Sequence, residues 1–126
     1  MLTHHAECRA RTAEAPGFID LTDEIQAAID RSPVAEGRIT VFSPSDGCAI
    51  LVNERETGLL QDIKAAIARL NGGRGRGHSL VGSASVVLPV SNGKLQLGQW
   101  QRVLLVELAE PTERTVSIQI VGESTG

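Results

Sequence analysis

Aromatic side chains are nearly absent from this chain of 126 residues, which contains two Phe, one Trp and no Tyr. Stacking of nucleotide bases needs several exposed rings, and a net charge of -3 creates no field that attracts phosphate backbones. Nucleic-acid binding is therefore not expected. RNA held by a basic glycine-rich loop ranks last among the alternatives, because no aromatic residues are interleaved with the arginines of that loop.

Cysteines and long apolar runs are also scarce. Cys8 and Cys48 are too few and too widely spaced for a metal cluster or a disulfide framework, so we expect two buried, reduced thiols. No apolar stretch approaches the length of a membrane span, and the first residues lack the apolar segment of a signal peptide. The sequence thus predicts a soluble cytoplasmic protein with no membrane partner.

The apolar content is 41%, mostly Val, Leu, Ile and Ala, which suits a single domain over residues 1–126 with its own core. We expect one helix from Thr22, an N-cap followed by two acidic residues, to about Arg31, and another from about Thr57 to Leu70. Strands are expected at residues 18–21, 37–42, 48–52, 80–90, 95–97, 101–108 and 115–121. Apolar and polar residues also alternate along residues 2–11.

The order of these elements predicts the architecture. Two helices come early and most strands lie in the C-terminal half, so the strand pairs should be largely antiparallel. The expected fold class is α+β, a mostly antiparallel sandwich with both helices packed on one face of the sheet. Apolar strand faces left uncovered would need a partner subunit, which predicts a small oligomer.

The densest pattern consists of two extended apolar runs around Asn92-Gly93, followed by G-Q-W-Q at residues 98–101. Asn and Gly tolerate positive φ, so the pair predicts a tight hairpin. Trp100 is expected to be a core or interface anchor, and Gln101 a ligand contact. Glu107 lies in the apolar run V-L-L-V-E-L. Strand alternation favours a carboxylate that faces water there, and the alternative is a partly buried acid in a site.

Four different segments, spread in order along almost the whole chain, carry a recognisable pattern. They read D-L-T-D-E-I, then A-I-L-V-N-E with G-L-L-Q-D-I after it, then P-V-S-N-G-K-L-Q-L-G-Q-W-Q, and finally V-E-L…R-T-V-S-I. Together they resemble the YjbQ-like family, whose patterns are D-I-T-x-E-V, H-T-T-A/C-x-x-T-I-N-E-N, P-V-x-x-G-x-L-x-L-G-T-W-Q and a closing R-x-V-x-V strand. The resemblance implies an α+β fold, a homotrimer, and a site at subunit junctions near the N-E and W-Q motifs.

The activity that this resemblance implies is an auxiliary thiamine-phosphate synthase reaction, which joins a pyrimidine pyrophosphate to a thiazole phosphate and releases pyrophosphate. The catalytic candidates are Asn53, Glu54 and Gln101, which would orient the phosphorylated substrate, with Mg²⁺ as the natural counter-ion of the leaving group. Glu54 would act as a general base or hold a cation. The alternative for Glu54 is a solvated acid that begins a loop.

The main departure from the family pattern is Ser45-Asp46-Gly47, which stands where the family has His-Thr-Thr. Ser45 and Asp46 remain candidate substrate contacts. Asp46 either partly replaces a ligand or is simply turn chemistry before a glycine. Cys48 matches a residue type of the motif. The missing histidines leave the metal ligands unknown and favour a rival function, a non-catalytic trimer that binds a small anion or a protein partner.

A glycine-rich loop covers residues 72–78 and includes Arg74, Arg76 and His78. Its backbone N–H groups and two guanidinium groups suit a phosphate, so these residues are further substrate-binding candidates. The alternative is a flexible linker with an exposed histidine. His4 and His5 are adjacent and would point to opposite faces of a strand, so we expect both at the surface.

Overall fold

The computed structural model describes residues 1–71 and 82–124. Within these ranges the chain forms two helices, α1 (Thr22–Arg31) and α2 (Thr57–Asn71), and eight strands. The strands are β1 (Leu2–Arg11), β2 (Gly17–Asp20), β3 (Glu36–Phe42), β4 (Cys48–Glu54), β5 (Ser85–Ser91), β6 (Lys94–Leu95), β7 (Gln101–Glu107) and β8 (Glu113–Glu123). No helix in the described ranges is long and apolar enough to cross a membrane.

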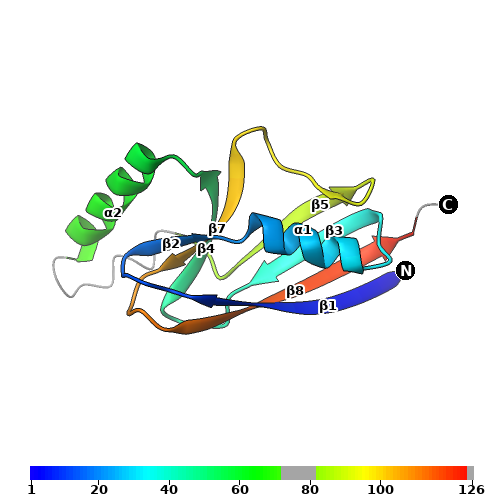
Figure 1. Cartoon of the computed structure of the whole chain (residues 1–126), viewed down its shortest axis with the longest axis horizontal. Coiled ribbons are helices and arrows are strands. Elements are labelled where there is room, and N and C mark those ends of the chain that lie inside the picture. The colour runs from blue at the N-terminus through cyan, green and yellow to red at the C-terminus, as the bar shows by residue number, and fades with distance from the viewer. Residues whose placement is uncertain (72–81, 125–126) are drawn as a thin grey trace.

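The strands form two sheets, ordered β1-β8-β3-β5-β6 and β2-β7-β4, and the strand pairs within both are antiparallel. The predicted α+β class with antiparallel pairing is confirmed. In the described part of the chain, four strands precede α2 and four follow it, rather than gathering in the C-terminal half, because residues 2–11 form one long strand. In Figure 1, α2 lies at the end of the molecule opposite the start of β1 and the end of β8.

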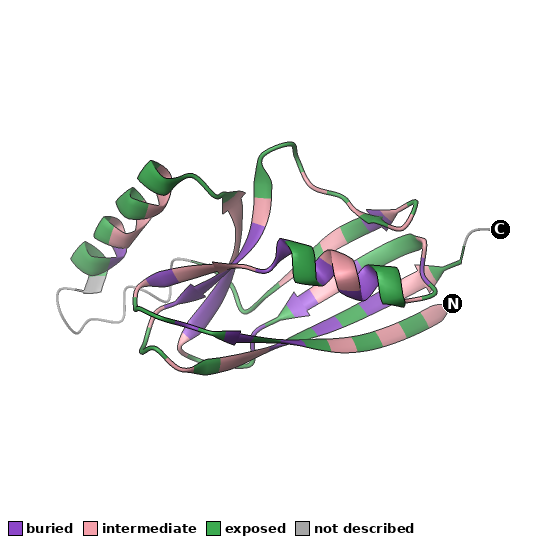
Figure 2. Ribbon diagram, in the orientation of Figure 1, coloured by how far each residue is buried: buried purple, intermediate pink, exposed green. Residues whose placement is uncertain are grey.

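The two helices cover opposite faces of the three-stranded sheet, whereas the sequence suggested one face. Val103 and Leu105 of β7 face the main core, which both sheets and α1 share. Val106 of the same strand faces a second core, which Ile67 of α2 completes. Because β7 is buried on both faces from Val103 to Glu107, each face needs its own cover (Figure 2).

Two local expectations had different outcomes. The predicted hairpin joins β5 to β6, with φ of 58° at Asn92 and 71° at Gly93, so this turn is confirmed. The predicted cap at Thr22 is wrong, because Leu21 is the N-cap and the Thr22 N–H donates to Asp20 Oδ1 at 2.9 Å. The Thr22 hydroxyl instead accepts a hydrogen bond from the Val103 N–H at 2.8 Å. The Leu21 N–H still donates to the Val103 carbonyl at 2.8 Å, whereas the Leu21 carbonyl accepts from the Ile25 N–H of the helix, so the Thr22 hydroxyl takes the place of that carbonyl as acceptor for β7.

Candidate functional site

The pairing of β4 with β7 places the candidate site residues at the two ends of one ladder. Cys48 lies opposite Glu107 at one end, and Glu54 lies opposite Gln101 at the other. The two ends are six residue steps apart along β4, which corresponds to roughly 20 Å. A hollow opens at each end, and the candidates of the sequence divide between them.

The first hollow, called the Trp100 hollow, has a volume of about 390 Å³ and is lined by Glu54, Arg55, Glu56, Gln99, Trp100 and Arg102. It therefore combines two acidic and two basic side chains with an indole. The indole-bearing residue is 67% exposed, so the expectation of a core anchor is wrong. Its role as an interface anchor stays a prediction.

The buried carboxylate of Asp20 holds both arginines of this hollow. Arg102 donates from Nε to Asp20 Oδ2 at 2.7 Å, and Arg55 Nη1 lies 3.1 Å from the same oxygen. Arg102 Nη2 also contacts Asp23 Oδ1 at 3.3 Å. Burial disfavours the charged form of Asp20, but hydrogen bonds from the Thr22 backbone and from Arg102 outweigh it and lower the pKa of Asp20.

The three predicted catalytic residues do not converge on one point. Glu54 and Gln101 share a face of the sheet, whereas Asn53 is paired with Arg102 and lies on the opposite face. Gln101 Oε1 accepts a hydrogen bond from the Gly98 N–H at 2.7 Å, and Asn53 Oδ1 accepts one from the Glu54 N–H at 2.8 Å. Of the three, only Glu54 lines the hollow.

The two acids of the Trp100 hollow differ in how they are bound. Glu56 accepts hydrogen bonds from the backbone N–H groups of Gly58 and Leu59 at the start of α2, and these bonds lower the pKa of Glu56. The Glu54 carboxylate makes no hydrogen bond or ion pair with any described residue. Within the described ranges, no group of three or more His, Cys, Asp or Glu side chains could hold a metal ion. Glu54 is thus the acid that can meet a ligand.

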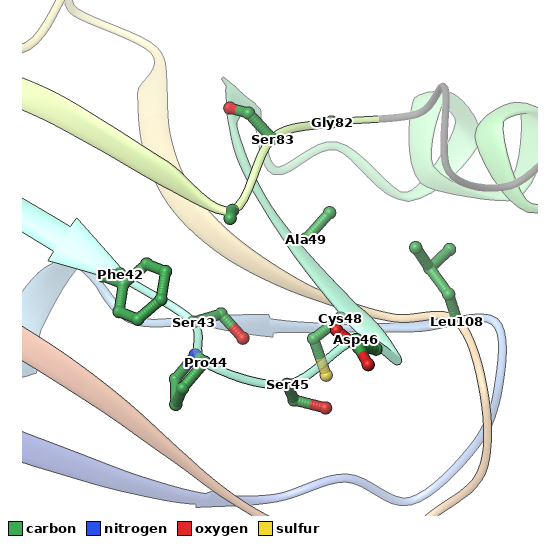
Figure 3. Close-up of a pocket in the computed structure, with 11 residues that line it drawn as sticks. Phe42, Ser43, Pro44, Ser45, Asp46, Cys48, Ala49, Gly82, Ser83 and Leu108 are labelled. Carbon is green, nitrogen blue, oxygen red and sulfur yellow. The ribbon is translucent and has the colours of Figure 1, made fainter.

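The second hollow, called the Ser43 pocket, has a volume of about 320 Å³ (Figure 3). It is lined by residues 42–46, 48, 49, 82–84 and 108. Ser45 and Asp46 therefore lie here, at the far end of the ladder from Glu54. Ser43 is 3% exposed, and its hydroxyl has no hydrogen-bond partner among the described residues.

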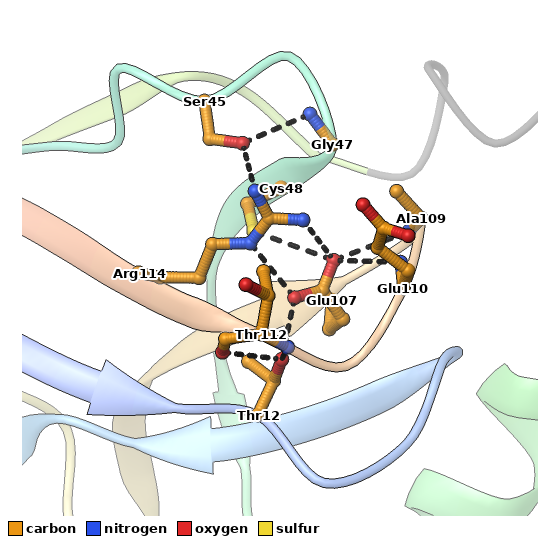
Figure 4. Close-up of polar contacts among 9 residues, drawn as sticks. All are labelled: Thr12, Ser45, Gly47, Cys48, Glu107, Ala109, Glu110, Thr112 and Arg114. Atoms are coloured by element: carbon orange, nitrogen blue, oxygen red, sulfur yellow. Dashed lines mark hydrogen bonds and ion pairs between the residues drawn. The ribbon is translucent and has the colours of Figure 1, made fainter.

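Glu107 anchors a buried polar network beside this pocket (Figure 4). Its carboxylate accepts two hydrogen bonds from Arg114, at 2.9 and 2.8 Å, and one from the Thr12 hydroxyl at 2.7 Å. Arg114 Nη1 donates to Ser45 Oγ at 2.8 Å, which links the network to the 43–47 loop. The expectation that Glu107 faces water is wrong, because both faces of β7 are buried and Glu107 is 0% exposed.

These contacts determine the ionisation of the network. Burial opposes the charge on Glu107, but the hydrogen bonds from Arg114 and Thr12 outweigh it and lower the pKa of Glu107 to about 2. Burial and the Glu107 charge raise the pKa of Cys48, whose Sγ lies 3.8 Å from Glu107 Oε2. The acid therefore stays ionised and the thiol protonated near neutral pH. Both cysteines are buried thiols, as expected.

Some predicted contacts are not placed, and others were missed. Arg74, Arg76 and His78 lie outside the described residues and stay predictions. Arg102 did not stand out in the sequence, and Arg114 entered only as the first residue of R-T-V-S-I, because their acidic partners are known only once the strands are paired. The signals for the buried network were a single acid inside an otherwise apolar run and its place in the same quoted segment as Arg114.

A sequence model of the family described as UPF0047 protein YjbQ-like matches residues 6–123. A UPF0047 protein of Archaeoglobus fulgidus is 34% identical over 127 residues, which cover 90% of this chain and 98% of the relative. A YbjQ-like protein of unknown function from Sulfolobus solfataricus P2 has a similar structure, with a TM-score of 0.88 and 30% identity over 97% of this chain and 99% of that one. A hypothetical protein from Aeropyrum pernix K1 gives a TM-score of 0.86 at 29% identity, covering 95% and 99% of the two chains.

Proposed function

The chain belongs to the UPF0047 YjbQ-like family, and from this premise we propose that it binds a small phosphorylated ring compound in the Trp100 hollow. One observation carries the proposal: an exposed indole and two guanidinium groups line the same hollow. Arginine binds phosphate oxygens through parallel N–H groups, and an indole face accepts a planar ring. A ligand with a ring at one end and phosphate at the other fits this combination.

The ion pairs of the two arginines are compatible with this role. A guanidinium carries five N–H donors, and Asp20 and Asp23 occupy only part of them. Arg102 makes no hydrogen bond from Nη1 within the described ranges. The acids thus hold the guanidinium groups in place and neutralise part of their charge, so the remaining N–H groups would bind a phosphate together with a cation held by Glu54.

The proposed reaction is that of an auxiliary thiamine-phosphate synthase. The bond between the pyrimidine methylene and its pyrophosphate oxygen breaks, and pyrophosphate leaves with the electron pair. The thiazole nitrogen forms the new bond to the methylene carbon. Arg55 and Arg102 stabilise the leaving charge, and Trp100 positions a ring. Glu54 suits Mg²⁺, which proteins commonly hold with one or two carboxylates plus substrate phosphates, and the ion would neutralise the leaving group.

A second candidate function is binding without turnover, with a small anion or a protein partner as the ligand. The observation that favours it is Ser45-Asp46-Gly47 at the position of the family histidine motif, which provides no imidazole and lies at the Ser43 pocket, at the other end of the ladder from the Trp100 hollow. The carboxamide of Gln101 is also engaged with Gly98. A scaffold that keeps the arginines without these groups can bind a phosphate without reacting.

The proposed assembly is a homotrimer in the cytoplasm, with the Trp100 hollow at a junction between subunits. Exposed Trp100, Phe42 and Val87 support it, since large apolar side chains at a surface are typical of interfaces. Sedimentation equilibrium at micromolar concentration tests the assembly. A monomer would refute the trimer, and the Trp100 hollow would then have to function within one chain.

The activity test compares thiamine phosphate formation by the native protein with that of Arg55→Ala and Glu54→Ala, and Arg69→Ala on α2 is the matched control. We expect Arg55→Ala to lower kcat/KM by about tenfold or more, because it removes charged hydrogen bonds to pyrophosphate. The control should retain the native value. If Arg55→Ala and Glu54→Ala also match it, the Trp100 hollow is not the site.

Calorimetric titration with pyrophosphate separates the two candidate functions. Binding that is weakened in Arg55→Ala, without turnover in the native protein, supports the non-catalytic candidate. If the native protein shows neither pyrophosphate binding nor turnover, the synthase reaction and the binding of a small phosphate anion are both refuted. The double variant Arg74→Ala/Arg76→Ala tests the glycine-rich loop in the same titration, and an unchanged affinity removes that loop from the site.

A further inference from the structure

A buried hydroxyl without a partner indicates a missing ligand in the Ser43 pocket. Ser43 is 3% exposed, lines the pocket, and has no hydrogen-bond partner for Oγ within the described part of the chain. Figure 3 shows the Ser43 side chain among the lining residues, with its hydroxyl on the side that faces Cys48. Buried hydroxyl groups in proteins are normally paired, so an orphan that borders a pocket marks a place for a hydrogen-bonding group.

The charges around the pocket select the kind of ligand. The exposed Asp46 carboxylate lines the pocket and makes no hydrogen bond or ion pair with any described residue. The nearest described cation, Arg114, is already neutralised by two hydrogen bonds to Glu107. Among the described residues the pocket therefore offers one negative charge without a partner, which attracts a cation and repels an anion.

The remaining lining adds a hydrogen-bond donor and an apolar wall. Ser45 Oγ accepts from the Gly47 N–H at 3.1 Å and from Arg114 at 2.8 Å, so its own proton is left to donate. Phe42, Pro44 and Leu108 supply apolar surface. The volume of about 320 Å³ falls within the range of small-molecule sites, roughly 300 to 1,000 Å³.

We infer that the Ser43 pocket binds a small organic amine with a ring and a hydroxyl group. The ammonium pairs with Asp46, the ring packs on the apolar wall, and the hydroxyl bonds to Ser43. This site lies at the opposite end of the β4–β7 ladder from the Trp100 hollow and does not depend on the function proposed there. The ligand inferred for the Ser43 pocket is a cation, whereas the ligand proposed for the Trp100 hollow is an anion.

Three ring compounds of similar size and different charge test the inference: 3-hydroxybenzylamine, 3-hydroxybenzyl alcohol and 3-hydroxybenzoate. Each is titrated into the native protein while backbone amide signals are followed by NMR. We expect saturable shifts at residues 43–48 with the amine, about tenfold weaker binding of the alcohol, and no binding of the carboxylate. Equal binding of the three probes overturns the inference. The absence of any saturable shift also overturns it, and this is the result expected if only water fills the pocket.

Matched variants assign the two ends of the ligand. Asp46→Asn should abolish the preference for the amine over the alcohol, whereas Asp62→Asn, which removes an exposed carboxylate from α2, should leave it intact. Ser43→Ala should weaken the hydroxylated amine several-fold and leave benzylamine, which lacks the hydroxyl, unchanged. If Asp46→Asn binds the amine as tightly as the native protein does, the amine is not bound by Asp46 and the assignment fails.

Discussion

The two ends of the β4–β7 ladder carry the same types of residue in opposite environments. At one end the Glu107 carboxylate is fully buried and accepts hydrogen bonds from Arg114 and Thr12. At the other end the Glu54 carboxylate is exposed and has no described partner, although Arg102 lies opposite the neighbouring Asn53. A similar acid therefore serves structure at one end and is available to a ligand at the other.

The difference follows from what covers each end. At the Glu107 end, Thr12 and Arg114 join the β1–β2 connection and β8 to β7, so several elements exclude water from one ion pair. At the Glu54 end the strands run out into loops, and water reaches the side chains of Glu54 and Trp100. Burial decides whether a charge holds the fold together or can be offered to a partner.

Arg114→Ala should produce the largest loss of stability. It leaves the Glu107 carboxylate buried without its partner, which typically costs about 3–5 kcal/mol of unfolding free energy. Arg55→Ala at the exposed end should cost no more than about 1 kcal/mol, because its ion pair with Asp20 is open to water on the arginine side. Urea denaturation of both variants measures the contrast. Equal losses would show that the two ends do not differ as described.

The double variant Glu107→Leu/Arg114→Met is the control for that comparison. Removing both charges together avoids an unpaired buried ion, so we expect it to be more stable than Arg114→Ala alone. A double variant as unstable as the single one would indicate that packing, and not the orphaned charge, causes the loss.

The pH dependence of stability should be the next largest effect. The pKa of Glu107 is about 2 in the folded protein against an ordinary value of 4.5, so its contribution is complete above about pH 5 and is lost as the pH falls towards 2. At pH 3 the native protein should have lost about 2 kcal/mol from this group. Urea denaturation at pH 6 and pH 3 measures the loss of unfolding free energy between the two pH values, which should be smaller for Glu107→Gln than for the native protein. The same loss in the native protein and the variant would contradict the buried ion pair.

Gln101→Ala should cost about 0.5–1.5 kcal/mol, because the Gly98 N–H loses its acceptor. Gln101→Glu keeps an acceptor in the same place and should recover most of that loss. Thermal denaturation of the pair distinguishes a turn contact from a ligand contact. If Gln101→Ala unfolds at the native temperature yet loses ligand binding, the carboxamide acts on the ligand rather than on the turn.

Trp100→Ala should have the smallest effect on stability, within about 0.5 kcal/mol for the isolated chain, because the side chain is largely exposed. Its effect should appear instead in ligand binding, measured by calorimetric titration of the native protein and the variant with pyrophosphate. A large loss of stability in dilute monomer would show that the indole packs against the fold after all.

Local patterns predicted most elements of the fold, because each depends on neighbouring residues. The Asn92-Gly93 turn and the period of α2 can be read without knowing the rest of the chain. The side of each sheet that a helix covers cannot be read in this way. An unbroken apolar run such as that of β7 indicates cover on both faces, but it does not identify the covering elements.

The candidate site was less predictable because its contacts are long-range. Asp20 and Arg102 are 82 residues apart, and Thr12 and Glu107 are 95 residues apart. Each pair meets only through the register of β2, β4 and β7. The motif residues Asn53, Glu54 and Gln101 meet at one end of the ladder, but only Glu54 lines the Trp100 hollow, and the arginines of that hollow came from the structure.

The register of β4 and β7 also limits how the length of this chain can change. Side chains alternate between faces, so inserting one residue within β7 would turn every residue on one side of the insertion to the other face. Glu107 would then point towards α2, or Gln101 would leave the face of Glu54. Insertions and deletions that preserve this register should therefore fall in the connections that flank β7, at residues 96–100 and 108–112.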